Sequence, residues 1–249
     1  MNIYDRKVVL VTGSSRGLGK EIVRKFASEG FDVVINYFKS KDEAFLLRDE
    51  IINKYNVKAI AIYADVSLES DVLAMLDEID KEFHHLDVLV NNAGISNDSL
   101  IEDKSIDSFN RVLEVNLSGT YLCSKYFGKY MYDKGFGSIL NIASNNGIDS
   151  YYPYSMDYDA SKAGVISLTH NFANLYAPKV RVNAIAPGWI DTSMNKDMDP
   201  SYRKEEEEKI LLGRFALSKE ISKDVYYIAV ESSYMNDSIV KIDGGKKVC

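Results

Sequence analysis

Short apolar runs alternate with longer amphipathic runs along nearly the whole chain, and this alternation limits the possible folds more than any other feature. The short runs are almost continuously apolar, as expected of parallel strands that are covered on both faces. Strands that alternate with helices predict an α/β fold with one doubly wound parallel sheet and helices on both of its faces. About seven strands are expected, at residues 7–12, 32–36, 58–63, 87–91, 138–143, 180–185 and 238–242.

The longer runs have helical periodicity. In residues 17–29, Leu18, Ile22 and Phe26 recur every four positions and form one apolar stripe. Further helices are expected at residues 41–55, 68–83, 106–116, 120–134, 155–176 and 219–232. Pro187 and Pro200 interrupt the stretch 186–212, which is predicted to be irregular, within a loop region of about 186–215. Without a linker, a low-complexity tract or a clear repeat, residues 1–249 are predicted to form a single Rossmann-fold domain.

Composition narrows the class of protein. The 249 residues are 46% hydrophobic and 27% charged, as in soluble globular proteins, and the net charge of -7 argues against nucleic acid as a partner. The first residues contain no apolar signal core, and no run is long enough to span a membrane, so a cytoplasmic location without a membrane partner is expected. Cys123 and Cys249 lack metal or redox spacing, and His84, His85 and His170 are interpreted as ordinary surface or core residues, so no metal is expected.

A glycine-rich turn between the first strand and the first helix predicts a phosphate-binding loop. Glycines at this place allow a tight turn and a close approach of the backbone to a phosphate, and the helix N-terminus offers free N–H groups to a pyrophosphate. The spacing is Gly-x-x-x-Gly-x-Gly, with Gly13, Gly17 and Gly19. The turn therefore predicts a dinucleotide cofactor on an α/β unit.

The end of the second strand bears on the choice between NAD and NADP. NAD sites often carry an acidic residue there, which binds the ribose 2′-hydroxyl. Here the strand ends in Asn36, and Asp32 stands at its other end. Arg16 and Lys39 can instead pair with a 2′-phosphate. NADP(H) is therefore favoured, and NAD(H) is left open.

Tyr158 and Lys162 are the candidate proton-transfer residues. Residues four apart share one face of a helix, so the Lys162 ammonium can lie near the Tyr158 phenol and lower its pKa toward a value useful at neutral pH. The Tyr-x-x-x-Lys pattern alone is weak, because this chain has 17 tyrosines. It recurs at Tyr37/Lys41, Tyr121/Lys125 and Tyr130/Lys134. Only the surrounding sequence sets Tyr158 and Lys162 apart.

That surrounding sequence resembles the classical short-chain dehydrogenase/reductase family. The resemblance covers essentially the whole chain and rests on several motifs in a family-like order. They are the glycine loop, Asn91-Asn92-Ala93-Gly94, Asn116, Ser144, Tyr158 with Lys162, Pro187-Gly188-Trp189-Ile190-Asp191-Thr192, and the closing Asp243-Gly244-Gly245.

The resemblance implies a catalytic set of four residues. Tyr158 would be the acid in reduction and the base in oxidation, and Ser144 would hydrogen-bond the substrate oxygen. Lys162 would bind the nicotinamide ribose and lower the pKa of the phenol, while Asn116 would hold the helix geometry and a proton-relaying water. It implies an NAD(P)-dependent oxidoreductase that acts on a ketone or a secondary alcohol.

The resemblance also implies the residues along the cofactor. Asp65 would lie beside the adenine, with Val66 next to it, and Ile190 and Thr192 would contact the nicotinamide amide. The remaining cofactor-binding residues implied are Gly13, Ser15, Arg16, Gly17, Leu18, Gly19, Lys39, Asn92, Ala93, Gly94, Tyr158, Lys162, Pro187 and Gly188.

The substrate is less defined than the reaction. Ser144 and Tyr158 are 14 positions apart, one more than is usual in the family, and the extra residue falls in 148–157 beside the substrate. The nearest subgroup by motif is the 3-oxoacyl-acyl-carrier-protein reductases, which share Leu212-Gly213-Arg214-Phe215. Lys125, Lys129 and Lys134 could attract an acidic carrier, whereas Asn174 stands where that subgroup often has arginine.

Alternative substrates and functions stay open. Glu205–Glu208 would repel an acidic carrier if this run faces the entrance. A sugar, polyol or hydroxysteroid dehydrogenase is the alternative enzyme, and a non-catalytic NADP-binding regulator is the alternative from another class. By family analogy the chain is expected to form a homo-oligomer, a tetramer or a dimer.

Overall fold

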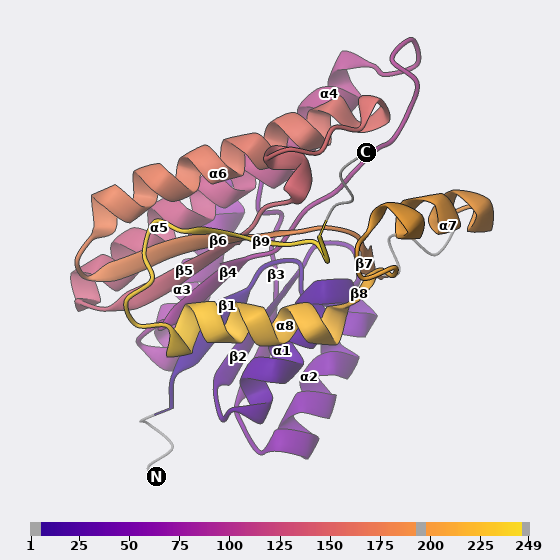
Figure 1. The fold of residues 1–249 in the computed structure, drawn as a ribbon. Helices are drawn as coiled ribbons and strands as arrows, with labels where there is room; N and C mark the ends of the chain where they lie inside the picture. The colour runs from indigo at the N-terminus through magenta and orange to yellow at the C-terminus, as the bar shows by residue number, and fades with distance from the viewer. Residues whose placement is uncertain (1–5, 193–197, 246–249) are drawn as a thin grey trace.

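A parallel sheet of seven strands runs through the centre of the molecule (Figure 1). The computed structural model describes residues 6–192 and 198–245. The strand order is β3-β2-β1-β4-β5-β6-β9, and each neighbouring pair is parallel. The strands are β1 (Val8–Val11), β2 (Asp32–Tyr37), β3 (Ala59–Tyr63), β4 (Val88–Asn91), β5 (Gly137–Ile142), β6 (Val180–Pro187) and β9 (Ile239–Ile242). The predicted doubly wound parallel sheet is confirmed.

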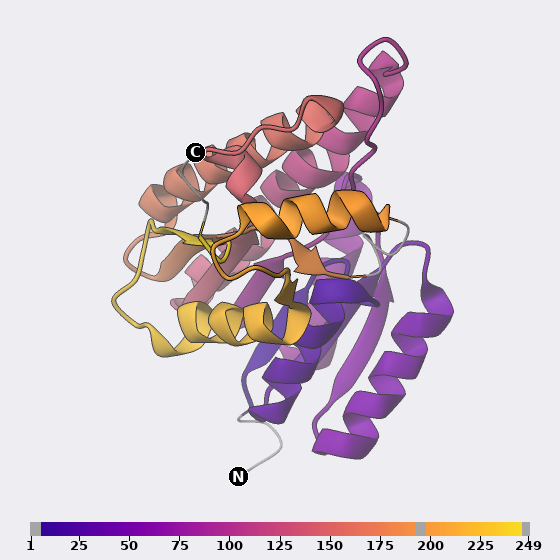
Figure 2. The same ribbon diagram turned by 45° about the vertical axis from the view of Figure 1, so that its right-hand side comes forward.

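Helices cover both faces of this sheet (Figures 1 and 2). On one face Val9 and Val11 of β1 pack in a cluster with residues of α1, α2 and α8, and on the other face Val8 and Leu10 pack in a cluster with residues of α3, α5 and α6. This two-sided burial explains why apolar residues predominate in the strands on both faces. The helices are α1 (Gly17–Ser28), α2 (Lys41–Tyr55), α3 (Glu69–Phe83), α5 (Gly119–Lys134), α6 (Met156–Tyr176) and α8 (Ser218–Tyr226).

The two helices expected at 106–116 and 120–134 are continuous, so the predicted break between them is wrong. Helix α4 (Ile106–Leu113) passes through a π-helical turn, Glu114–Ser118, directly into α5. Gly119 does not end the helix. A Cβ on Gly119 would lie 2.7 Å from Cγ2 of Val66, so the glycine serves a close approach between α5 and the end of β3.

The region 186–215 is more regular than predicted. It contains β7 (Ile190–Asp191), paired with β8 (Ala216–Leu217), and helix α7 (Pro200–Lys209). Asp199 caps α7 by accepting from the backbone N–H groups of Ser201 and Tyr202, and Pro200 occupies its first turn. Proline is well tolerated there, so it marks a helix start in this chain and not an interruption. Residues 193–197 of the predicted loop lie outside the described residues.

Several other expectations concern the chain as a whole. Within residues 6–192 and 198–245, no helix combines the length and the apolar character that a membrane crossing requires. The expectations for the first five residues and for Cys249 lie outside the described residues, whereas Cys123 is buried and its burial raises the pKa of the thiol to about 12. The single domain over 1–249 stays a prediction.

Candidate active site

The predicted site residues gather at the carboxyl edge of the sheet. The chain order reverses between β1 and β4, and in open α/β sheets ligands bind beside such a reversal. The glycine loop follows β1, Asp65 and Val66 follow β3, and Asn92–Gly94 follows β4. Ser144 follows β5, and the segment from Pro187 to Thr192 begins at the last residue of β6. A single edge therefore holds residues that are up to 179 positions apart in the chain (192 − 13).

Thr12 and Asn92 fix the glycine loop against the turn after β4. The Thr12 hydroxyl accepts from the backbone N–H groups of Asn92 and Ala93, each at 3.0 Å, and Asn92 Nδ2 donates to the Thr12 carbonyl at 2.9 Å. Gly13 has φ +61°, and a Cβ there would lie 2.9 Å from Cα of Ala93. Gly17 has φ +58° with open space around the position of a Cβ, so a phosphate can approach its backbone.

The end of β2 presents basic charge. The Asn36 side chain at this end already has hydrogen-bond partners within the protein, since its Oδ1 accepts from Gly13 N at 2.9 Å and its Nδ2 donates to Ala64 O at 3.1 Å. Lys39 follows the strand, with its Nζ 5.8 Å from the Phe38 ring, and Arg16 precedes α1. Among the described contacts neither of these two cations pairs with a carboxylate. Asp32 lies at the opposite end of β2, where its Oδ1 accepts from Lys58 N at 2.7 Å.

Asp65 is held by groups that the sequence did not point to. Its Oδ1 accepts from the backbone N and the hydroxyl of Ser67, and its Oδ2 accepts from Arg111 at 2.7 Å. Burial acts to raise the pKa of Asp65, but the bonds from Ser67 and Arg111 outweigh it and hold the pKa below its usual value. Asp65 is thus a fixed anion beside β3, and Arg111 of α4 is an unforeseen neighbour of the expected adenine position.

Ser144, Tyr158 and Lys162 come together as expected. The Ser144 side chain, just after β5, lies close enough to the Tyr158 phenol in the first turn of α6 to act on its pKa. Lys162 is 4% exposed, its Nζ donates to the Ile142 carbonyl at 2.7 Å, and the same atom lies 5.5 Å from the centre of the Tyr158 ring. A Cβ on Gly94 would lie 3.7 Å from Lys162 Nζ, so the turn after β4 also reaches this group.

Burial moves both ionisable groups toward their neutral forms. Burial raises the pKa of Tyr158 to about 12, although the nearby Ser144 acts to lower it, and the carboxylates of Asp159 and Asp98 act to raise it further. Burial lowers the pKa of Lys162 to about 8. Desolvation is the largest influence on each group, so the net shift of the phenol pKa in the protein alone is upward, and the lowering expected from Lys162 stays a prediction.

Asn116 sits in the π-helical turn between α4 and α5. Its Oδ1 accepts from Ile95 N at 2.8 Å, and its Nδ2 donates to Ile95 O at 2.9 Å and to Ser161 Oγ at 3.0 Å. The Ser161 hydroxyl in turn donates to the Tyr158 carbonyl at 2.7 Å. Asn116 thus couples the turn after β4 to the helix that carries Tyr158, and π-helical turns often occur at functional sites.

The longer spacing between Ser144 and Tyr158 is absorbed by a compact segment. Two short 3-10 turns, Asn145–Gly147 and Pro153–Ser155, fill it. Asp159 ties the segment to α6, because its carboxylate accepts from Asn146 Nδ2 at 2.7 Å and from Tyr152 N at 2.9 Å. The additional residue therefore changes the loop without separating Ser144 from Tyr158.

The other Tyr-x-x-x-Lys pairs have structural contacts. Tyr130 donates to Asp80 at 2.5 Å, and Lys125 donates to Glu69 at 3.0 Å, both on the surface between α5 and α3. Tyr37 is buried in β2 beside Phe45 and Tyr63. In the part of the chain that the structure describes, no group of three His, Cys, Asp or Glu side chains is placed to hold a metal ion.

A surface hollow of about 430 Å³ lies away from this site. Lys7, Asp87, Ser138 and Arg181 line it, next to the amino ends of the strands. Ligands of open α/β sheets bind at the carboxyl ends, so the hollow is not the candidate site.

The fold and this edge define a class of protein. The parts of a dinucleotide-dependent oxidoreductase are present: a glycine loop at a helix N-terminus, one cation in that loop and one after β2, and a phenol beside a buried amine.

Comparisons with known proteins agree with that class. Residues 7–203 match the sequence profile of the family described as short chain dehydrogenase. Two curated relatives are 3-oxoacyl-acyl-carrier-protein reductases FabG. The protein from Aquifex aeolicus is 36% identical over 241 residues, 96% of each chain, and the one from Staphylococcus epidermidis is 35% identical over 96% of this chain and 98% of its own.

Solved structures of the same family superpose closely. A mutant of a Serratia marcescens short-chain dehydrogenase/reductase is 31% identical and has a TM-score of 0.89 over 96% of this chain and 97% of its own. A putative short-chain dehydrogenase/reductase from Burkholderia xenovorans is 25% identical with a TM-score of 0.87 over 97% and 98%. The chain belongs to the short-chain dehydrogenase/reductase family and is an oxidoreductase that uses a nicotinamide cofactor.

Proposed function

We propose that the protein interconverts a ketone and a secondary alcohol with NADP(H), and that Tyr158 is the acid and base of the reaction. The observation that carries this proposal is the proximity of the Ser144 side chain to the Tyr158 phenol, whose pKa it acts to lower, with Lys162 Nζ 5.5 Å from the centre of the Tyr158 ring. Two hydroxyls that meet at the carboxyl edge of the sheet can both reach one substrate oxygen. When bound, the cofactor supplies or accepts the hydride.

The residues of this chain would handle the proton. In reduction, Tyr158 donates its phenolic proton to the oxygen of the carbonyl as that oxygen gains negative charge. In oxidation, the phenolate takes the proton from the alcohol. A pKa of about 12 keeps Tyr158 protonated at neutral pH, which favours its role as a donor. Ser144 holds the oxygen, and the buried Lys162 ammonium stabilises the phenolate left behind.

Replacement of the phenol tests this assignment. Tyr158→Phe removes the transferable proton but keeps the ring, so turnover should fall by about a thousandfold or more while the NADPH dissociation constant stays within about twofold. Tyr130→Phe is the matched control, because Tyr130 belongs to another Tyr-x-x-x-Lys pair and bonds to Asp80. Turnover by Tyr158→Phe at the wild-type rate would overturn the proposal.

The cofactor preference is proposed from the basic end of β2. Arg16 in the glycine loop and Lys39 after β2 would pair with the 2′-phosphate, whereas the Asn36 side chain is hydrogen-bonded to Gly13 and Ala64. Lys39→Asp should therefore raise the KM for NADPH by about tenfold or more and change the KM for NADH much less. Lys54→Asp, at the far end of α2, is the control for the change of net charge. Equal effects on both cofactors would refute the phosphate contact.

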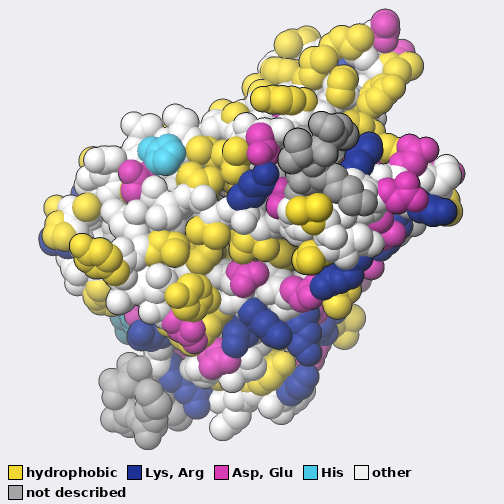
Figure 3. All heavy atoms as spheres, viewed as in Figure 1, with side chains coloured by type: hydrophobic (Ala, Val, Ile, Leu, Met, Phe, Trp, Pro, Cys, Tyr) yellow, Lys and Arg dark blue, Asp and Glu magenta, His cyan; other side chains and the backbone are white. Residues whose placement is uncertain are grey.

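The proposed substrate is a 3-oxoacyl thioester, as the names of the curated relatives suggest. A group of exposed apolar side chains favours a substrate with an acyl chain. They gather on the protruding end of the molecule above α4 (Figure 3) and continue along the segment before Tyr158. The residues are Ile95, Leu100, Ile101, Ile106, Ile148, Tyr154 and Met156, each at least 36% exposed.

A sugar, polyol or hydroxysteroid substrate is the second candidate, because polar groups also surround Tyr158. The rings of Tyr152 and Tyr202 lie 6.4 Å apart between their centres, and the Asp98 carboxylate is close enough to both Tyr158 and Tyr202 to raise their pKa values. These groups suit hydroxyl-bearing ligands.

The lysines expected to attract an acidic carrier protein give little support to a carrier-bound substrate. Lys125, Lys129 and Lys134 each lie within 4 Å of a carboxylate, and Asn174 donates to the His170 carbonyl. Glu205–Glu208 lies on α7. A free acetoacetyl thioester is therefore a better first substrate than a carrier-bound one.

A substrate panel decides among these readings. Acetoacetyl-CoA, acetoacetyl carrier protein, keto sugars and ketosteroids are each followed by the absorbance of NADPH and of NADH. Turnover of the thioesters alone supports the first reading, and turnover of sugars or steroids alone supports the second. NADPH binding without oxidation by any carbonyl would instead indicate a non-catalytic NADP-binding regulator.

A further inference from the structure

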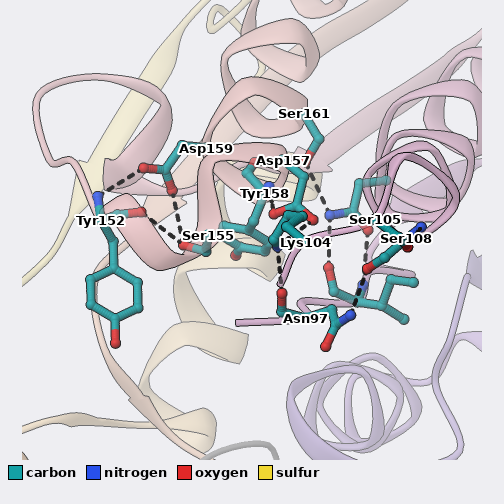
Figure 4. Close-up of polar contacts among 12 residues, drawn as sticks. Asn97, Lys104, Ser105, Ser108, Tyr152, Ser155, Asp157, Tyr158, Asp159 and Ser161 are labelled. Atoms are coloured by element: carbon teal, nitrogen blue, oxygen red, sulfur yellow. Dashed lines mark hydrogen bonds and ion pairs between the residues drawn. The ribbon is translucent and has the colours of Figure 1, made fainter. Parts of the chain in front are cut away.

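A buried ion pair lies directly before the proposed catalytic tyrosine (Figure 4). Lys104 Nζ is 2.7 Å from Oδ2 of Asp157, and their side chains are 5% and 0% exposed. Asp157 is in the first turn of α6, whereas Lys104 belongs to the loop between β4 and α4, 53 residues earlier. Pairs this well buried are unusual, because each charge must be removed from water.

Each member of the pair makes a second contact. Lys104 Nζ also donates to the Asn97 carbonyl at 2.5 Å, so it draws the beginning and the end of its own loop together. Oδ1 of Asp157 accepts from the backbone N of Tyr158 at 3.0 Å. The two oxygens of one carboxylate therefore connect the loop to the backbone of Tyr158.

The same loop is joined to the Tyr158 turn at two further points. Asn116 bonds to Ile95 at the start of the loop and, through Ser161, to the carbonyl of Tyr158. The backbone N of Ser99 donates to the Tyr154 carbonyl at 3.0 Å. The peptide N–H and the carbonyl of Tyr158 are thus both held, one by the Lys104–Asp157 pair and the other by Asn116 through Ser161.

We propose that Lys104 and Asp157 are positioning residues that act through Tyr158: their ion pair fixes the orientation of the tyrosine against the loop of residues 95–105. Neither residue exchanges a proton with substrate. The contribution of the pair is geometric, because misplacing a reacting group by about 1 Å can cost about a hundredfold in rate. This inference rests on the proposed function of Tyr158.

Single substitutions remove the ion pair and leave one buried charge without a partner. Lys104→Met and Asp157→Asn should each lower kcat by about ten- to a hundredfold and lower the Tm. The NADPH dissociation constant, measured by fluorescence, should stay within about twofold, because neither residue contacts the glycine loop. If a single variant fails to fold, the kcat of the double variant tests the positioning role.

The double variant separates positioning from folding. Lys104→Met with Asp157→Asn removes both charges, so the Tm should recover much of its loss, since no buried charge lacks a partner. The ion pair between the loop and α6 is still absent, so kcat should remain at least about fivefold below that of the wild type. If kcat returned to the wild-type value together with the Tm, or if the folded single variants kept wild-type kcat, the positioning role would be refuted.

Two controls make the outcome specific. Lys81→Met with Asp77→Asn removes an exposed ion pair of 3.0 Å on α3 and should leave kcat and Tm unchanged. Wild type and Tyr158→Phe are measured in the same assay. Retained turnover in Tyr158→Phe refutes the proposed function itself, whereas its loss together with wild-type kcat in the pair variants refutes only the positioning role.

Discussion

At the scale of single residues, desolvation shifts the pKa values of the two groups central to the site toward each other. It raises the pKa of the partly buried Tyr158 phenol to about 12 and lowers the pKa of the buried Lys162 amine to about 8, so the amine is still mostly protonated at pH 7. The sequence suggested only the attraction between the two. Burial depends on residues far away in the chain, such as Gly94 and Ile142, so helical spacing could not reveal it.

Burial of Lys162 should cost stability, and its replacement tests this. With a pKa of about 8 in the folded protein and 10.5 in the unfolded chain, the folded state binds fewer protons between these pH values. Stability should therefore rise with pH through that window, and the full penalty is present below it. In the absence of cofactor, Lys162→Met should raise the Tm at pH 7 by a few degrees and abolish turnover.

The pH dependence of the Tm is the decisive measurement for Lys162→Met. Thermal scans from pH 7 to pH 10 should show the gap between Lys162→Met and wild type narrowing as pH rises, because the wild type loses its penalty. Lys81→Met, at an exposed position of α3, should show no such change. A variant that is less stable than wild type at pH 7 would show that contacts of the ammonium outweigh its desolvation.

The sequence motifs pointed to the candidate reacting residues and to Asn116, but not to the ion pair beside Tyr158. Ser144, Asn116 and Tyr158 follow from motifs that keep their order along the chain. Lys104 and Asp157 belong to none of these motifs, and a lysine in a loop with an aspartate in a helix is ordinarily solvated. Their pairing depends on how the loop after β4 folds back on α6, which no local pattern records.

At the scale of elements, α7 shows how local signals can be misread. Its sequence is almost entirely polar and begins with a proline, and these features led to the expectation of an irregular stretch. None of the residues of α7 is buried. Trp189 Nε1 donates to Glu206 at 3.0 Å, and Arg203 bonds to both Asp191 and Glu207 and lies 4.7 Å from the Phe215 ring. Tertiary contacts therefore hold this helix in place.

Arg203 is expected to hold α7 against the site. Because the Tyr202 ring of α7 lies against the Tyr152 ring beside the candidate active site, loosening the helix should weaken substrate binding more than it affects stability. Arg203→Met should raise the KM of the carbonyl substrate by about three- to tenfold, with a Tm change of about 2 °C or less. Steady-state kinetics with each substrate of the panel provide the measurement.

Arg48→Met is the matched control for this variant. Arg48 also pairs with a carboxylate, Asp49, and lies 4.5 Å from an aromatic ring, Phe45, but it belongs to α2. It should leave the KM of the carbonyl substrate unchanged. An equal rise in KM for both variants would mean that α7 has no special part in binding.

At the scale of the whole molecule, the order of elements was the most predictable property. Parallel strands joined by helices admit few arrangements, because each connection must cross over in the same hand. That constraint brings the loops after β1, β3, β4, β5 and β6 to one edge, whatever their individual sequences. The site could therefore be located from sequence, whereas the contacts that tune it could not.

The assembly of whole chains gives the last prediction. We propose a homo-oligomer, by analogy with the family, formed through α4 and α5 and the region of β9. The structure offers suitable surfaces, because β9 is an edge strand of the sheet and Tyr121 on α5 is 43% exposed. Light scattering should therefore give the mass of two or four chains. Tyr121→Glu should shift that mass toward one chain, since a charge at the centre of an interface opposes association. Leu46→Glu, at a residue of α2 that is 70% exposed, should not. A wild-type mass of one chain, or an equal response to both variants, would contradict this assembly.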